Sequence, residues 1–457
     1  MKTNPALHPA RRAAILLAVF KITTASAQIS TNAQLSLAPT NSGALSLNIS
    51  NSGDQVWVVQ SSSNLISWTT VERVKVFNGT YHRSYTNGSN GNLFYRAFYD
   101  STLQTIADTT TNALSLPATN YNYASPSLPA SYSVNPILAE DNTPGNDPTT
   151  DAGTTLGRAL FYDKRLSTNQ TVSCASCHVQ ANGFSDPRQF SVGYNGSLGT
   201  RNAMGLSNAR WYQRKKFFWD ERAATLEDQT LQPIQNPIEM GMTLSALTNR
   251  LAAEPYYTNL FAAAFGSTAI TTNRISFALA QFVRSIVSTQ SKYDIGVTNN
   301  FANFTAQENL GRQIFLGQVG NATCAVCHGT DNFVPTTTLN NNGLEFPFVD
   351  LGVGGITGVT AQNGLFKVPS LRNIALTAPY MHDGRFTNLD QVVEFYNSGV
   401  VFNVNLSPPL RAPGGNSALR LNLTTAQKSA LVAFLNTLTD TNLATDAKLS
   451  DPFNYGN

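Results

Sequence analysis

All four cysteines of the chain belong to two copies of one pattern, C-x-x-C-H. The copies are Cys174-Ala175-Ser176-Cys177-His178 and Cys324-Ala325-Val326-Cys327-His328. In this pattern the two thiols form thioether bonds to the vinyl groups of a haem, and the histidine that follows binds the iron. A zinc site, a disulfide pair and chance compete with this interpretation, but a zinc site would not need a histidine after each pair. Two identical frames with no cysteine left over favour two covalently bound haem c groups.

The small number of histidines limits the ligands available to the two irons. Of five histidines, His178 and His328 take the proximal positions in the two motifs. His8 lies in an N-terminal segment that we expect to be removed, and His82 lies in a strand-like region, where a surface position is favoured over a ligand role. Only His382 remains near other motif residues.

The N-terminus predicts an export signal. Arg11 and Arg12 precede a short apolar run at 13–20, and the A-S-A at 25–27 fits a cleavage site, so residues 1–27 are predicted to be a signal peptide. The run is too short to span a membrane, and a retained interfacial anchor is the alternative. Since c-type haem attachment takes place outside the bacterial cytoplasm, we expect a soluble periplasmic or secreted protein without a membrane span.

The net charge of the chain gives no support for nucleic-acid binding. Only 12% of the residues are charged and the formal net charge is +3, which is too small to argue for nucleic-acid binding. A weakly charged surface rich in Asn, Thr and Ser suits an exported protein. It is also compatible with an electrostatic encounter with a small redox protein.

Two kinds of hydrophobic pattern divide the chain. Strand-like alternation at 45–49, 56–58 and 94–98, broken by Asn-Gly and Ser-Gly turns, predicts a small all-β sandwich domain over 28–100. The stretch 56–69 resembles a β-sandwich module found on many secreted bacterial proteins, for which a binding or spacer role is expected.

The rest of the chain is predicted to be mainly α. A Ser-, Thr- and Pro-rich linker covers 101–135. Helical periodicity follows at 154–162, 272–288, 305–316 and 424–438, with Thr424 and Gln427 spaced as a capping box. Helices around two haem motifs about 150 residues apart predict two cytochrome c-like haem lobes, over 136–304 and 305–457.

Further motifs surround the haem motifs. They are LGRALFYD at 156–163 with LS at 166–167, GTRN at 199–202, FWDERA at 218–223, VPSLRN at 368–373 and APYMHDGRF at 378–386. Through these motifs the chain from roughly 135 to 453, about 70% of its length, resembles the bacterial di-haem cytochrome c peroxidase family, which includes the methylamine-utilisation protein MauG. Plain electron carriers share C-x-x-C-H but not this set.

The resemblance implies an open first haem. In many peroxidases of the family a loop histidine occupies the sixth position of the N-terminal haem and must detach before peroxide binds. Here Tyr194 stands at that position, sixteen residues after His178, and the loop holds no histidine. We therefore expect a five-coordinate, high-spin haem that is ready for peroxide without prior reduction. Tyr194 is either a pocket-edge residue or a ligand.

The resemblance places the distal ligand of the second haem fourteen residues after His382, at Tyr396. This ligand is methionine in many peroxidases and tyrosine in MauG. A tyrosinate stabilises ferric iron, whereas methionine favours the ferrous form. Ligation by Met381, with Tyr396 as a packing residue, is the alternative. His382 is expected to orient a loop or a haem propionate.

Heterolysis of peroxide requires a group that moves a proton from the inner to the outer oxygen. The resemblance assigns this role to Glu239, with Gln229 as a pocket glutamine and Pro233 at the open face of the haem. A carboxylate partly buried over a haem would have a raised pKa. Trp219 corresponds to a tryptophan that relays electrons between the haems. A solvated glutamate and a core tryptophan are the alternatives.

The resemblance also implies a calcium ion between the lobes, bound by Asn202, Thr377 and Pro379, whose oxygens suit a hard cation. The expected function is reduction of hydrogen peroxide at the first haem, with electrons from a small cytochrome c or cupredoxin entering through the second haem. A MauG-like oxidase that acts on a protein substrate, and a non-catalytic di-haem electron carrier, are the alternatives. Whether the chain forms a homodimer stays open.

Overall fold

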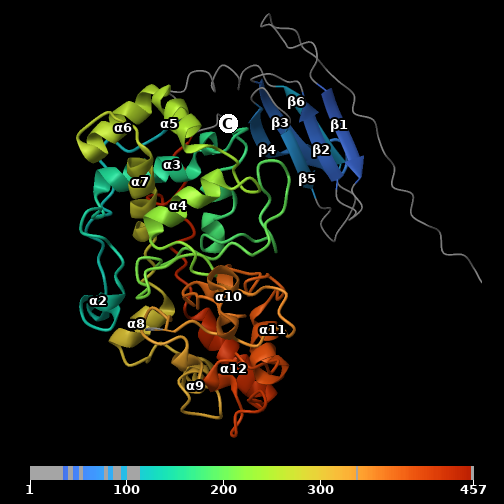
Figure 1. The fold of residues 1–457 in the computed structure, drawn as a ribbon, viewed down its shortest axis with the longest axis vertical. Coiled ribbons are helices and arrows are strands. Elements are labelled where there is room, and N and C mark those ends of the chain that lie inside the picture. The colour runs from blue at the N-terminus through green and yellow to red at the C-terminus, as the bar shows by residue number, and fades with distance from the viewer. Residues whose placement is uncertain are drawn as a thin grey trace, which may run out of the picture.

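The computed structural model describes residues 34–39, 45–50, 55–76, 81–85, 94–99, 114–335 and 338–453. Its strands form one body, and its helices form a second, larger body built from two lobes (Figure 1). The predicted signal peptide lies outside the described residues. Within these residues, no helix combines the length and the apolar character that crossing a membrane requires.

The β body contains two antiparallel sheets of three strands each, in the orders β1-β2-β5 and β4-β3-β6. The strands are β1 (Gln34–Pro39), β2 (Leu45–Ser50), β3 (Gln55–Ser62), β4 (Thr69–Val76), β5 (Tyr81–Tyr85) and β6 (Phe94–Tyr99). All three stretches that alternation marked in the sequence are strands. Trp57 and Val58 are neighbours on β3 and both are buried, so both faces of this strand are covered.

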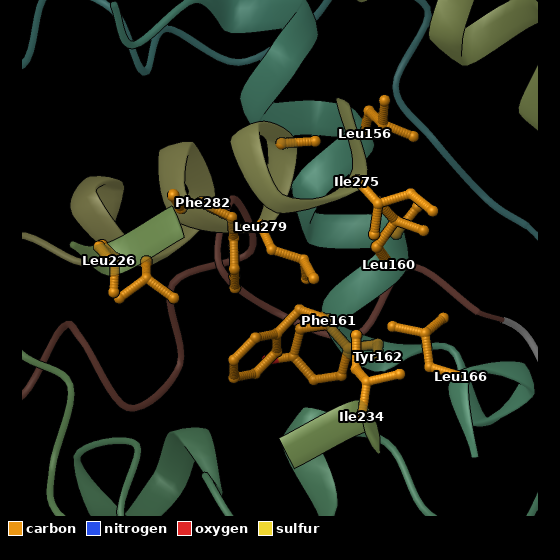
Figure 2. Packing of buried hydrophobic residues seen from close by; sticks show 14 of the residues in the cluster. Leu156, Leu160, Phe161, Tyr162, Leu166, Leu226, Ile234, Ile275, Leu279 and Phe282 are labelled. Atoms are coloured by element: carbon orange, nitrogen blue, oxygen red, sulfur yellow. The ribbon is translucent and has the colours of Figure 1, made fainter. Parts of the chain in front are cut away.

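The first helical lobe surrounds the first haem motif. Its helices are α3 (Asp151–Tyr162), α4 (Leu226–Gln235), α5 (Leu244–Ala252), α6 (Pro255–Phe265) and α7 (Thr272–Ser285). Leu156 and Leu160, four residues apart on α3, form an apolar face that packs on Leu279 and Phe282 of α7 (Figure 2). Thr150 caps α3 by accepting a hydrogen bond from the Gly153 N–H, so the helix begins three residues earlier than predicted.

The second lobe has the same plan around the second motif. Its helices are α8 (Lys292–Thr298), α9 (Ala306–Phe315), α10 (Val353–Thr357), α11 (Leu389–Glu394), the π-helical η9 (Phe395–Gly399) and α12 (Thr425–Asn436). The capping box of Thr424 and Gln427 is confirmed. Short 3-10 turns connect the lobes' elements: η2 (Ala130–Ser133), η3 (Lys164–Leu166), η4 (Cys174–Ser176), η5 (Gln180–Asn182), η6 (Cys324–Val326), η7 (Thr360–Gln362), η8 (Ile374–Leu376) and η10 (Pro408–Leu410).

One close helix contact occurs in both lobes. A Cβ placed on Gly157 of α3 would lie 1.8 Å from the carbonyl oxygen of Ala278 on α7. A Cβ placed on Gly311 of α9 would lie 1.9 Å from the carbonyl oxygen of Ala430 on α12. In each lobe the helix that precedes the haem motif therefore crosses a later helix with backbones in contact, which only glycine permits. The two lobes therefore share one arrangement of paired helices.

The segment predicted as a linker is only partly free of the lobes. Residues 101–113 lie outside the described residues, but Tyr123 and Tyr132 are each only 3% exposed. Tyr132 packs edge-on against Trp211 with ring centroids 4.6 Å apart, just before α2 (Ile137–Glu140). Isolated aromatic anchors in a polar stretch produce no periodicity, so the sequence pattern did not reveal this packing.

Candidate functional site

The first haem motif forms the tight turn η4. The backbone N–H of His178 donates to the Cys174 carbonyl at 2.9 Å, which closes the turn formed by the motif. The imidazole Nδ1 of His178 lies 2.8 Å from the Phe184 carbonyl oxygen. Because a carbonyl can only accept, this contact favours the tautomer with the proton on Nδ1, in which the Nε2 lone pair can bind a metal. Burial lowers the pKa of His178, so the ring is held in the neutral form that ligation needs.

The second motif repeats this arrangement in η6. The His328 N–H donates to the Cys324 carbonyl, and Nδ1 lies 3.2 Å from the Phe333 carbonyl oxygen. Burial lowers the pKa of His328 to about 4. All four cysteines lie in the described part of the chain and none is in a disulfide. Among these described residues, no group of three or more His, Cys, Asp or Glu side chains gathers as a metal site.

A cavity of about 240 Å³ opens directly over the second motif. It is lined by Cys324, Cys327 and His328 and by apolar side chains from α11 and α12. Two thiols, a neutral imidazole and apolar walls are the donor set and surroundings of a covalently bound haem. The residues present therefore fit this group.

Both candidate sixth ligands of the second iron line the same cavity. Tyr396 lies in η9, where α11 widens into a π-helical turn, a feature often found at functional sites. Burial raises the pKa of Tyr396 to about 12. Met381 lies in the loop after Pro379, with a positive φ of 74°. The structure thus brings the two together rather than separating them.

Trp219 reaches this cavity from the first lobe. Its indole Nε1 donates to the Asn202 carbonyl at 2.9 Å, and its ring meets that of His382 edge-on at 6.4 Å. The His382 ring stacks on the Phe366 ring with the centroids 4.0 Å apart. The backbone carbonyl of His382 accepts a hydrogen bond from the Asn202 N–H. Contacts between the lobes therefore hold Trp219 in the wall of the second-motif cavity.

The three calcium candidates gather in the same wall. Asn202 comes from the first lobe and Thr377 and Pro379 from the second, and all three line the cavity. Near them the Arg201 guanidinium joins Asp220 at 2.5 Å and Asp350 at 2.6 Å, so the lobes are also tied by an ion pair. Any cation held by the three candidates would be bound by carbonyl and amide oxygens rather than by carboxylates.

Glu239 lies in the loop after α4, half-buried, on the side of the first motif. Burial raises its pKa, while the charge of Arg222 and a 2.7 Å hydrogen bond from Asn236 act in the opposite direction. Burial also raises the pKa of Cys174 and Cys177, and the Glu239 carboxylate adds to both shifts, so it lies within electrostatic reach of the thiols. A carboxyl group with a raised pKa beside a haem motif is suited to acid–base chemistry.

Gln229 and Pro233 stand four residues apart on α4 and so share one face of this helix. Both are half-buried. α4 ends at Gln235, and the following turn carries Glu239. The structure therefore gathers the predicted pocket residues along one helix and its C-terminal loop.

Tyr194 is fastened to the Glu239 loop. Its N–H donates to the Glu239 carbonyl at 2.9 Å, and its own carbonyl accepts from the Asn169 amide at 2.7 Å. Its ring packs so closely on Gly241 that a Cβ there would lie 2.5 Å from Cε1. These contacts support the pocket-edge position, with the ring resting on backbone. His82 lies in β5, paired with Asn48 of β2 in the β body.

Two cavity residues were missed by the sequence reasoning. The Lys367 ammonium lies 3.9 Å above the Tyr212 ring and 4.7 Å above the Phe217 ring, and burial lowers its pKa to about 8. Asn342 donates its side-chain N–H to the Met381 sulfur at 3.4 Å. Lys367 directly precedes the VPSLRN motif, which was the one available indication, and nothing in the sequence marked Asn342.

Comparisons with known proteins agree with this geometry. The family described as di-haem cytochrome c peroxidase matches residues 151–301. The methylamine utilization protein MauG of Methylorubrum extorquens is 35% identical over 298 residues, covering 65% of this chain and 80% of that protein. The cytochrome c551 peroxidase of Nitrosomonas europaea is 33% identical over 288 residues, covering 62% of this chain and 79% of that protein.

Solved structures give the same picture. A MauG-like protein associated with microbial copper homeostasis superposes with a TM-score of 0.61 at 34% identity, covering 70% of this chain and 99% of that chain. The diheme peroxidase BthA of Burkholderia thailandensis superposes with a TM-score of 0.56 at 24% identity, covering 67% of this chain and 91% of that chain. The second likeness supports the fold alone.

Proposed function

Because the chain belongs to the di-haem cytochrome c peroxidase family, which includes MauG, and is thus a di-haem oxidoreductase, we propose that it reduces hydrogen peroxide to water in the first lobe. One observation carries this proposal. A half-buried carboxylate, Glu239, stands on the side of the first motif, while the candidate ligands Tyr396 and Met381 stand over the second motif. Glu239 would supply acid–base chemistry in the first lobe, and one of the two candidates would supply the sixth ligand in the second, as a division into peroxide and electron-transfer sites requires.

The residues of the chain would act as follows. The haems, when bound through the two motifs, supply the peroxide-binding iron and the path for electrons. Glu239 accepts the proton from the inner peroxide oxygen and returns it to the outer one, which leaves as water. Asn236 holds the carboxylate in position, and Gln229 and Pro233 form the pocket wall. Two electrons and two further protons complete the reduction of one peroxide to two waters.

We assign the electron path to Trp219 and the second lobe. Trp219 lines the second cavity while its backbone belongs to the first lobe, which supports a relay between the two haems. Tyr396 is the proposed ligand of the second iron. Lys367, a buried cation in the same wall, would pair with a haem propionate, and Asn202, Thr377 and Pro379 would hold a calcium ion between the lobes.

The domain boundaries and the location of the protein complete the proposal. We propose a signal peptide over 1–27, a β-sandwich accessory domain over 28–100, a linker over 101–135, a peroxidatic domain over 136–304 and an electron-transfer domain over 305–457. The protein would work in the periplasm or outside the cell. Its electron donor would be a small cytochrome c or cupredoxin, which the weak positive charge suits.

A second candidate function is MauG-like oxidation of a residue in a partner protein. Two observations favour it. Tyr396 lies in the second cavity, where a tyrosinate would stabilise oxidised iron, and the Tyr194 loop holds no histidine. Relatives at 35% identity include a MauG protein.

Electron paramagnetic resonance of the ferric protein tests the proposal. We expect one high-spin centre, from the His178 haem, and one low-spin centre, from the His328 haem. Stopped-flow mixing with peroxide should then change the Soret spectrum without prior reduction. Two low-spin centres, or no reaction in the ferric state, would exclude an open peroxide site. Oxidation of a small cytochrome with turnover would separate the peroxidase from the MauG-like enzyme.

A further inference from the structure

Asn342 lies between the two candidate ligands of the second iron. Its side-chain Nδ2 donates to the Met381 sulfur at 3.4 Å. Burial raises the pKa of the Tyr396 phenol, and the neighbouring Asn342 amide acts in the opposite direction, as an N–H donor near the phenol oxygen would. All three residues line the cavity over the second haem motif. Since a primary amide carries two N–H donors, one group can serve both acceptors.

The backbone around Asn342 is fixed on both sides. The Asn341 side chain is 2% exposed and accepts from the Gly343 N–H at 2.8 Å. The Asn341 N–H donates to Ser407, and the Gly343 carbonyl accepts from the Val401 N–H at 2.8 Å. Such anchoring fixes the backbone from which the Asn342 amide projects, so only the two side-chain torsions of Asn342 set the position of this amide.

The two acceptors differ in what the hydrogen bond does to them. A phenolate oxygen has several lone pairs, so it can accept from Asn342 and still bind iron. The Met381 sulfur is a weak acceptor with only two lone pairs. A donor directed at this sulfur draws electron density from it, which makes it a poorer ligand, and holds the flexible thioether chain toward Asn342.

We propose that Asn342 selects the sixth ligand of the second iron, because it supports Tyr396 as the ligand and retains Met381 on its own amide. The inference rests on the proposed haem in this cavity. It makes Asn342 a positioning residue, since it acts through the two ligands. Tyrosinate and thioether ligation favour opposite oxidation states, so this single amide would set the oxidation state in which the second lobe rests.

The test uses full-length holoprotein and reads the ferric spin state by electron paramagnetic resonance, together with the near-infrared sulfur-to-iron absorption band. In Tyr396→Phe alone, Asn342 still retains Met381, so we expect the second haem to become high-spin. In Tyr396→Phe with Asn342→Leu, Met381 is released, so we expect a low-spin haem with the near-infrared band. Adding Met381→Leu should remove that band and restore the high-spin signal.

A matched control is Asn340→Leu in the Tyr396→Phe background. Asn340 lines the same cavity, but its amide donates to Thr338 and accepts from Ser407. This variant should behave like Tyr396→Phe alone. Asn342→Ala serves as a second variant if Asn342→Leu does not fold with both haems attached.

Two results would overturn the inference. One is the near-infrared band in Tyr396→Phe alone, which would show that Asn342 does not retain Met381. The other is a high-spin second haem when Tyr396→Phe is combined with Asn342→Leu, or with Asn342→Ala where the leucine variant does not fold, which would show that removing the Asn342 amide does not release Met381. The proposed function fails on a different measurement, the peroxide reaction of the unaltered protein, so the two failures are distinguishable.

Discussion

Replacing Glu239 by glutamine tests the acid–base assignment most directly. The substitution keeps the size of the side chain, and the amide oxygen can still accept from Asn236, which now donates at 2.7 Å. Only the ability to take up and return a proton is lost. General acid–base catalysis typically contributes about 10²–10⁴-fold to a rate. Since Glu239 is half-buried rather than enclosed, water can partly replace it, and we expect a loss near the lower limit.

The expected loss in the second-order rate constant with peroxide is about 10²-fold, equivalent to about 2.7 kcal/mol of activation free energy. Stopped-flow mixing of the ferric protein with excess peroxide measures it through the Soret change. The wild-type rate should fall as the pH drops through the pKa of Glu239, which burial holds above its ordinary value. The Glu239→Gln variant should lack this pH dependence.

A control and a stability measurement accompany the variant. Asp228→Asn removes an exposed carboxylate from the first turn of α4 and should leave the rate unchanged. Because the folded pKa of Glu239 is raised, its contribution to stability is complete below the unfolded pKa and is lost as the pH rises through the folded pKa. Glutamine does not lose this contribution, so at neutral pH the variant should melt no earlier than the wild type. A peroxide rate within twofold of wild type would refute the assignment.

Two further predictions concern packing and electrostatics. Gly311→Ala should lower the free energy of unfolding by about 1–3 kcal/mol in denaturant titrations, because its Cβ would lie 1.9 Å from the Ala430 carbonyl oxygen. Gly145→Ala, where nothing lies within 4 Å, should be neutral, and a Gly311→Ala protein of unchanged stability would contradict the close crossing. Lys367→Met should lower the reduction potential of the second haem in a spectroelectrochemical titration. A unit charge ~10 Å away at an effective dielectric constant of ~20 contributes roughly 1.7 kcal/mol, or tens of millivolts, and an unchanged or higher potential would exclude a Lys367–propionate pair.

Residues adjacent in sequence were the easiest to interpret. The C-x-x-C-H frames contain two thiols and a histidine within five positions, so their chemistry could be predicted before any fold was known. Helix starts such as the capping box of Thr424 and Gln427 are equally local, and the structure contains this one as predicted. The predicted ends of helices were less accurate. The helix that we predicted to end at Ser288 ends at Ser285, because the end of a helix depends on what its last turn packs against.

Contacts between segments far apart in the chain could not be predicted from the sequence. Met381 and Tyr396 looked like exclusive alternatives, whereas the fold places both in one cavity with Asn342 between them. Asn342 belongs to no recognisable motif. Its position depends on hydrogen bonds that its two neighbours in sequence make with residues about sixty positions further along the chain. The buried position of Tyr132 was hidden for the same reason.

The sequence by itself determined the covalent chemistry, the two-lobe plan and the family, because these depend on residue types at short, fixed spacings. Only the tertiary structure decided which side chains share a cavity, how far Glu239 is removed from water and where the lobes meet at Trp219. Burial and proximity are properties of chain segments that come together from far apart in sequence, and they set the pKa of an acid, the freedom of a ligand and the path of an electron.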